Sequence, residues 1–180
     1  MKIILTLLLF VSLYADVKKD MLELYQHEKY EAACNIGFSN FGKYDEDENF
    51  LSLYAFSCLK ADYIDRLSAP VIKLKFTTEA RANATYFSTI LLQKKMLYYA
   101  LVDGYKLKSL NLPTTDYVLS KVFDLYSQLE NNESKEYYIF EDKEDKKRKY
   151  KLYLQKAERI DKMVIEEFYD TISVKRHVYW

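Results

Sequence analysis

A single long helix is predicted by residues 77–104, which read TTEARANATYFSTILLQKKMLYYALVDG. Apolar side chains recur there every three or four positions, a spacing that places them on one face of a helix. They are Ala80, Ala84, Phe87, Leu91, Tyr98 and Leu101, with Tyr105 just beyond. Thr77 or Thr78 can accept a hydrogen bond from a free backbone amide and so cap the first turn. We therefore expect the longest helix to start at Glu79, with a possible break at residues 93–95.

Shorter segments with helical spacing lie on both sides of this helix. They predict helices over about residues 16–27, 30–41, 48–60 and 63–67, and another that Thr114, Thr115 or Asp116 caps and Asn131-Asn132 stops. Asp47 or Asn49 can cap the helix over 48–60. The 180 residues include only 3 Gly and 2 Pro, which argues against a turn-rich β protein. Most of the chain is therefore predicted to be helical.

The C-terminal third has a different pattern. Residues 137–140 (YYIF) favour a strand, residues 141–149 are densely charged, and residues 150–155 alternate apolar and polar. This predicts a β-hairpin around a charged turn, followed by a helix over about 157–169. One long helix is the alternative, because a set of apolar residues also fits a helical face: Tyr150, Leu154, Ala157, Val164 and Phe168. The apolar ending Tyr179-Trp180 is expected to pack back on the domain.

The N-terminus, MKIILTLLLFVSLYA, has the pattern of a secretory signal. Lys2 supplies the positive charge, and residues 3–13 form an apolar core that only Thr6 and Ser12 interrupt. This core is shorter than the roughly 20 residues that span a bilayer, and it has the length of a signal-peptide core. Cleavage is predicted near Ala15, which places the mature protein in the periplasm. An uncleaved anchor or a buried N-terminal helix is the alternative.

The two cysteines, Cys34 and Cys58, fall on neighbouring predicted helices. In an oxidising compartment such a pair is typical of a disulfide. The chain-entropy model gives roughly 3.5 kcal/mol for a closed loop of about 25 residues. The alternative is two buried free thiols. Catalytic thiol chemistry is not expected, because the two cysteines do not form a CxxC motif.

Residues 24–33, LYQHEKYEAA, are similar to the turn between the two helices of a tetratricopeptide-like (TPR-like) repeat. Residues 59–67, LKADYIDRL, resemble the same segment. Tyr30 and Tyr63 lie 33 residues apart, close to the 34-residue period of that family. The pattern departs from the family at His27, where a small Gly is usual, and at Arg66, where a second Ala is usual. The resemblance covers about residues 17–76. It implies stacked antiparallel helix pairs whose concave face binds another polypeptide, and it carries no catalytic residue.

Together these patterns predict a mainly α fold, a TPR-like helical-hairpin array in a single domain, with a small C-terminal β-hairpin followed by a helix. We expect a signal peptide over residues 1–15 and a helical-repeat-like domain over 16–132. Residues 133–180 are expected to pack on the same domain as its C-terminal hairpin and helix.

The sequence contains few motifs that carry chemistry. With 27 basic and 27 acidic residues, the chain lacks the excess charge of a nucleic-acid binder. Only two histidines are present, His27 and His177, and there is no Gly-rich phosphate loop. Asp45, Asp47 and Asn49 resemble the start of a calcium loop, but Phe50 stands where that loop requires Gly. We therefore predict no catalytic residue, no metal site and no cofactor.

Two classes of function remain. The first is an exported non-enzymatic protein that acts as a protein-interaction or scaffold module in the bacterial cell envelope. Its partner would be another envelope protein or a peptide, and the mature chain would have no integral membrane span. Tyrosine is unusually frequent, at 18 residues, and tyrosines supply large contact areas in binding sites. The candidate partner-binding residues are Tyr25, Tyr54, Tyr86, Tyr98 and Tyr99.

The second class is an envelope hydrolase, directed at glycans or peptides, that uses a carboxylate pair. Glu166-Glu167 is such a pair only if one carboxyl is buried and its pKa is raised. Adjacent residues of a helix point to different faces, so these two side chains are expected to flank a surface instead.

Overall fold

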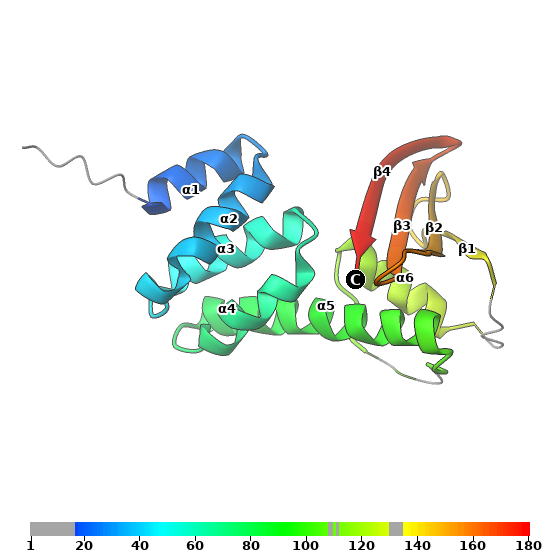
Figure 1. Cartoon of the computed structure of the whole chain (residues 1–180), viewed down its shortest axis with the longest axis horizontal. Helices are drawn as coiled ribbons and strands as arrows, with labels where there is room; N and C mark the ends of the chain where they lie inside the picture. The colour runs from blue at the N-terminus through cyan, green and yellow to red at the C-terminus, as the bar shows by residue number, and fades with distance from the viewer. Residues whose placement is uncertain (1–16, 108–109, 111, 130–134) are drawn as a thin grey trace, which may run out of the picture.

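The computed structural model describes residues 17–107, 110, 112–129 and 135–180. Within them, helices precede a four-stranded sheet (Figure 1). The α-helices are α1 (Val17–Gln26), α2 (Tyr30–Asn40), α3 (Glu48–Lys60), α4 (Ser68–Lys73), α5 (Thr78–Asp103) and α6 (Val118–Ser127), and two 3-10 helices span Phe41–Lys43 and Ile64–Leu67. The predicted signal peptide, the Asn131-Asn132 stop and the predicted boundary at 132 lie outside the described residues.

Helices α2 and α3 pack closely and are joined covalently. A disulfide links Cys34 to Cys58, with their Cα atoms 4.7 Å apart, which confirms the predicted pairing. One turn further along α2, Gly37 faces Tyr54, and a Cβ atom on this glycine would come within 2.3 Å of the tyrosine ring. The helix pair therefore depends on the absence of a side chain at position 37.

The turns that follow α1 and α3 have the same backbone pattern. Glu28 and Asp62, 34 residues apart, both adopt the left-handed conformation, with φ of 59° and 63°. In each turn the amide of the following residue donates a hydrogen bond to a carbonyl of the preceding helix. Lys29 N donates to Leu24 O at 2.9 Å, and Tyr63 N donates to Cys58 O at 2.8 Å. The second turn places the Asp62 carboxylate at the C-terminal end of α3.

Side-chain caps fix the starts of two helices, as the sequence predicted. The Asp47 carboxylate accepts a hydrogen bond from Phe50 N at the start of α3, and the Thr77 hydroxyl accepts one from Ala80 N at the start of α5. Helix α5 shows no break at residues 93–95. It is one continuous helix that Gly104 caps, and Gln93 and Lys94 are buried within it. The predicted cap of α6 was wrong: Tyr117 stands at that position without a side-chain cap.

The sheet is an antiparallel meander in the order β1-β2-β3-β4. Its strands are β1 (Tyr137–Glu141), β2 (Arg148–Gln155), β3 (Lys162–Tyr169) and β4 (Ile172–Tyr179). Alternate side chains point to the face that packs on the helices. On this inner face the register places Tyr150 opposite Glu167, and Glu167 opposite Lys175. His177 and Tyr179 follow Lys175 on the same face, opposite Ile165 and Met163.

The predicted fold class was therefore wrong in its C-terminal part. The hairpin over 137–155 is present, but the expected helix over 157–169 is strand β3, and the tail forms β4. The chain is a helical array with a C-terminal sheet and not a helical-repeat array throughout. The ambiguity arises from Val164 and Phe168, which are four residues apart. A spacing of four places two side chains on one face of a strand as well as on one face of a helix.

Helices α5 and α6 join the sheet to the rest of the chain, and in Figure 1 α5 runs alongside both parts. On the sheet side, the Tyr126 ring of α6 packs edge-on against Tyr138 of β1. The Tyr98 hydroxyl of α5 donates to Asp161 O at 2.8 Å, just before β3. Buried residues of both parts belong to one hydrophobic core. Of the described helices, none has the length and apolar content needed to cross a membrane.

Candidate functional site

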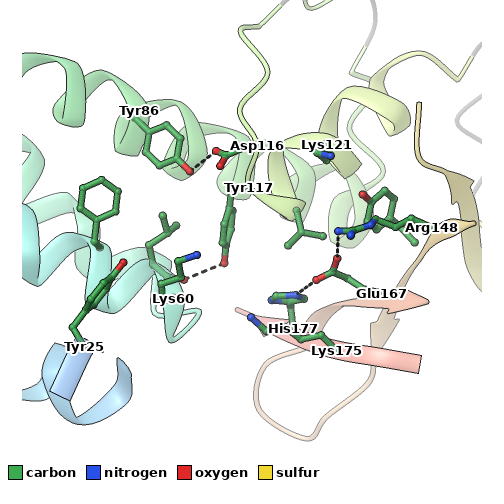
Figure 2. A pocket seen from close by; sticks show the side chains of 14 residues that line it. Tyr25, Lys60, Tyr86, Asp116, Tyr117, Lys121, Arg148, Glu167, Lys175 and His177 are labelled. Atoms are coloured by element: carbon green, nitrogen blue, oxygen red, sulfur yellow. Dashed lines mark hydrogen bonds and ion pairs between the residues drawn. The ribbon is translucent and has the colours of Figure 1, made fainter. Parts of the chain in front are cut away.

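A cleft of about 310 Å³ lies between the helices and the inner face of the sheet (Figure 2). Every major element except α2, α4 and β1 contributes to its lining. The residues are Tyr25 of α1, Phe56, Leu59 and Lys60 of α3, Tyr86 of α5, Asp116, Tyr117, Val118 and Lys121 at the start of α6, Arg148 and Tyr150 of β2, Glu167 of β3, and Lys175 and His177 of β4.

His177 forms part of the cleft wall and connects the sheet to the turn after α3. Its imidazole is 2% exposed. Nδ1 lies 2.8 Å from Asp62 Oδ1 and 2.9 Å from Asp62 Oδ2, and Nε2 lies 2.9 Å from Glu167 Oε1. Ionised carboxylates only accept hydrogen bonds, so both ring nitrogens act as donors and the ring is an imidazolium.

The protonation of His177 follows from this arrangement. Burial alone would lower the pKa of the imidazole, but hydrogen bonds to Asp62 and Glu167 and the charge of Asp62 outweigh it, and the pKa is raised above its ordinary value. The hydrogen bond from His177 lowers the pKa of the Glu167 carboxyl. Since both ring nitrogens are engaged, His177 has no free lone pair with which to accept a proton from a ligand.

The half-buried Tyr117 and the buried Tyr179 complete the surroundings of Asp62. The Tyr117 hydroxyl donates to Asp62 Oδ1 at 2.6 Å and lies 3.2 Å from the Tyr179 hydroxyl. Burial, together with the Asp62 carboxylate, raises the pKa of Tyr117 well above its ordinary value, and burial raises that of Tyr179 likewise. Both phenols are therefore neutral donors, and Asp62 connects a helix end, the start of α6 and strand β4.

The cationic side chains of the cleft are less fully paired than its carboxylates. Lys60 and Lys175 are exposed and form no ion pair with any other described residue. Arg148 Nη1 forms an ion pair with Glu167 Oε2 at 3.6 Å, a distance beyond hydrogen-bond range. Lys121 is 3.1 Å from Asp142, whose carboxylate also accepts hydrogen bonds from the Tyr150 hydroxyl and two backbone amides.

An aromatic wall forms another part of the cleft lining. The Phe56 ring packs edge-on against Phe87 at a centroid distance of 4.8 Å, and Tyr86 packs beside them. The Tyr86 hydroxyl donates to Asp116 Oδ1 at 2.8 Å, so this cleft carboxylate also has a partner. Tyr25 adds a half-buried ring from α1. The cleft thus combines apolar rings with several cations, of which Lys60 follows Phe56 on α3, whereas Arg148 and Lys175 come from the sheet.

The chain matches no family model, and no curated protein or solved structure is significantly similar to it. The resemblance of residues 17–76 to TPR-like repeats stays a prediction. The chemistry of the cleft is then the ground on which a function can be proposed.

The five candidate tyrosines do not form one surface. Tyr25 and Tyr86 line the cleft together. Tyr54 is 1% exposed and belongs to the core beside Gly37. The Tyr98 hydroxyl is engaged by Asp161 O, and Tyr99, which is 49% exposed, stacks on Tyr105 outside the cleft. The structure therefore brings together only the first two.

The most connected residues of the site escaped sequence reasoning. His177 and Asp62 are 115 positions apart, and no motif links them. Glu167 was expected on a helical surface, but it lies on the inner face of β3, while Glu166 points to the other face toward Tyr153 and Arg176. The available signal was the alternation in β4, where Lys175, His177 and Tyr179 share a strand face.

The described residues include no group of three or more His, Cys, Asp or Glu side chains arranged to hold a metal ion. The acids that resembled a calcium loop have other partners. Asp45 lies beside Lys73, while Asp47 caps α3 and lies 2.7 Å from Lys18.

Proposed function

We propose that this chain is an exported, non-enzymatic protein-interaction module of the bacterial cell envelope, and that it binds its partner in the cleft between the helices and the sheet. The observation that carries the proposal is the composition of this cleft. It combines the rings of Tyr25, Phe56 and Tyr86 with the cations Lys60, Arg148 and Lys175, and its imidazole is fully engaged by carboxylates. Aromatic rings and arginine dominate binding hot spots.

The Cys34–Cys58 disulfide supports the location. Structural disulfides persist in oxidising compartments such as the periplasm. The proposed location also rests on the signal pattern of residues 1–15. N-terminal sequencing of the protein from an envelope fraction should give a chain that starts near Asp16. A chain that starts at Met1 would contradict cleavage.

The alternative function, a hydrolase that uses Glu166 and Glu167 as a carboxylate pair, is less well supported. Carboxylate-pair hydrolysis needs one carboxyl with a raised pKa, whereas the pKa of Glu167 is lowered by His177. Its neighbour Glu166 lies on the opposite face of the strand, so the two carboxylates do not converge.

The test of the binding function is affinity capture from envelope extract with the tagged mature protein. A double variant, Tyr25→Ala with Tyr86→Ala, should lose the specific partner while its far-ultraviolet circular dichroism is unchanged. Tyr99→Ala is the matched control, because Tyr99 is exposed but lies outside the cleft. Capture that the double variant retains, or that Tyr99→Ala loses equally, would refute the cleft as the binding site.

A further inference from the structure

Building on the proposed function, we infer that the cleft recognises a carboxylate of the partner polypeptide, held by Lys60, Arg148 and Lys175 against the aromatic wall (Figure 2). The three cations come from three different elements: the last residue of α3, the first of β2, and the middle of β4. They meet at one cavity only in the folded chain, and nothing in their local sequence brings them together.

The charges in the cleft are unequally compensated. Asp62 accepts hydrogen bonds from His177 and Tyr117, Glu167 from His177, and Asp116 from Tyr86. Each of these carboxylates is thus engaged by the protein itself. Lys60 and Lys175, in contrast, form no ion pair among the described residues, and the charge of Lys175 only contributes to the lowered pKa of Glu167. A concave site lined by excess charge of one sign focuses the field and attracts the opposite charge.

The size of the cavity limits what can enter it. A volume of about 310 Å³ is at the small end of the range for ligand pockets. It accommodates one or two residues of an extended segment, and a folded surface would not enter. The aromatic wall can contact the apolar part of such a segment. The guanidinium and ammonium groups of the cleft can form charge-assisted hydrogen bonds with a carboxylate.

The carboxylate can belong to an acidic side chain or to a free C-terminus, and blocked peptides distinguish the two. We would titrate the mature protein, at low salt and observed by NMR, with three hexapeptides. Acetyl-hexaglutamate amide carries side-chain carboxylates only, acetyl-hexaglutamine acid carries a terminal carboxylate only, and acetyl-hexaglutamine amide carries neither. One of the first two should shift resonances of cleft residues, and the third should not. Absence of binding by both acidic peptides, or tighter binding of inorganic phosphate, would overturn the inference.

Charge variants locate the binding. Lys60→Glu with Lys175→Glu should raise the dissociation constant of the bound peptide at least tenfold. The neutral Lys60→Gln with Lys175→Gln should raise it less. Lys19→Glu with Lys106→Glu is the control, because both lysines are exposed and lie outside the cleft. Wild-type affinity in the charge-reversed cleft variant would refute the inference. If that variant still captures the envelope partner while the tyrosine double variant does not, the proposed function stands without carboxylate recognition.

Discussion

His177 Nδ1 lies 2.8 Å from Asp62 Oδ1, although the two residues are 115 positions apart. This contact links the last strand of the sheet to the turn after α3. It also determines the charge in the cleft, because the imidazolium is held between Asp62 and Glu167 and neutralises part of both. The helices and the sheet are thus connected at the wall of the proposed binding site itself.

Asp62→Asn should destabilise the protein. Breaking a buried ion pair by removing one partner costs roughly 3–5 kcal/mol. We expect about 3 kcal/mol, the low end of that range, because Glu167 would still hold the other ring nitrogen. Asparagine tolerates the left-handed backbone of this turn. Urea unfolding of both proteins measures the difference.

The matched control for this substitution is Glu28→Gln. Glu28 has the same left-handed conformation in the equivalent turn after α1, and its side chain is exposed. It should change the free energy of unfolding by less than about 0.5 kcal/mol, as is usual for surface positions. Equal losses in the two variants would show that the turn, and not the ion pair, is responsible.

The stability of the protein should fall as the pH rises above neutral. The pKa of His177 is raised in the folded state. The resulting stabilisation is complete below the unfolded value of about 6.5 and is lost as the pH rises through the folded pKa. The groups that face the ring are Asp62, Glu167, Lys175, Tyr117 and Tyr179. Both tyrosines stay neutral over this range, because their pKa values are raised well above the ordinary one.

His177→Gln provides the comparison for the pH profile. Melting temperatures of both proteins between pH 5 and 9 should differ most at the acidic end and converge at the alkaline end. When the measurements are extended below about pH 4.5, the stability of the wild type should decrease again. The stabilisation that comes from the lowered pKa of Glu167 is lost as the pH falls through the folded-state pKa of this carboxyl. A constant difference between wild type and variant across pH 5–9 would show that His177 does not titrate in this range.

Replacing the disulfide should cost stability without changing the fold. Cys34 and Cys58 are 24 positions apart, and a closed loop of this length is worth roughly 3.5 kcal/mol in the chain-entropy model. We expect the Cys34→Ala, Cys58→Ala variant to lose about that much in urea unfolding. Reductant should lower the stability of the wild type and leave the variant unaffected. If reductant has no effect on the wild type, the bond contributes nothing to stability.

The sequence predicted local structure well and long-range structure poorly. The starts of α3 and α5 were predicted because Asp47 and Thr77 cap helices through amides three residues away. The disulfide was predicted from the number of cysteines and their neighbouring helices. Strand β3 was missed because the spacing of its apolar residues also suits a helix, and only pairing with β2 and β4 decides between the two.

The candidate site depends on the same long-range pairing. Tyr25 and Tyr86 were chosen for their chemistry, and the fold brings them to one cleft. Asp62 and His177 carry no local sign of their contact, because it arises only when β4 packs beside the end of α3. Tyr54 was selected by residue type as well, but burial against Gly37 makes it part of the core.

Gly37→Ala should destabilise the contact between α2 and α3. A Cβ atom at this position would lie 2.3 Å from Tyr54 Cδ2 and 2.8 Å from Tyr54 Cβ, so the ring and the helix must both move. Overpacking of a core typically costs 1–3 kcal/mol, which outweighs the gain of up to about 1 kcal/mol that alanine gives over glycine inside a helix. Gly42→Ala is the control, because a Cβ atom there meets no other atom within 4 Å. Urea unfolding should show a lower midpoint for Gly37→Ala and an unchanged or higher one for Gly42→Ala. An equal or raised midpoint for Gly37→Ala would mean that α2 and α3 are not packed as closely as the structure has them.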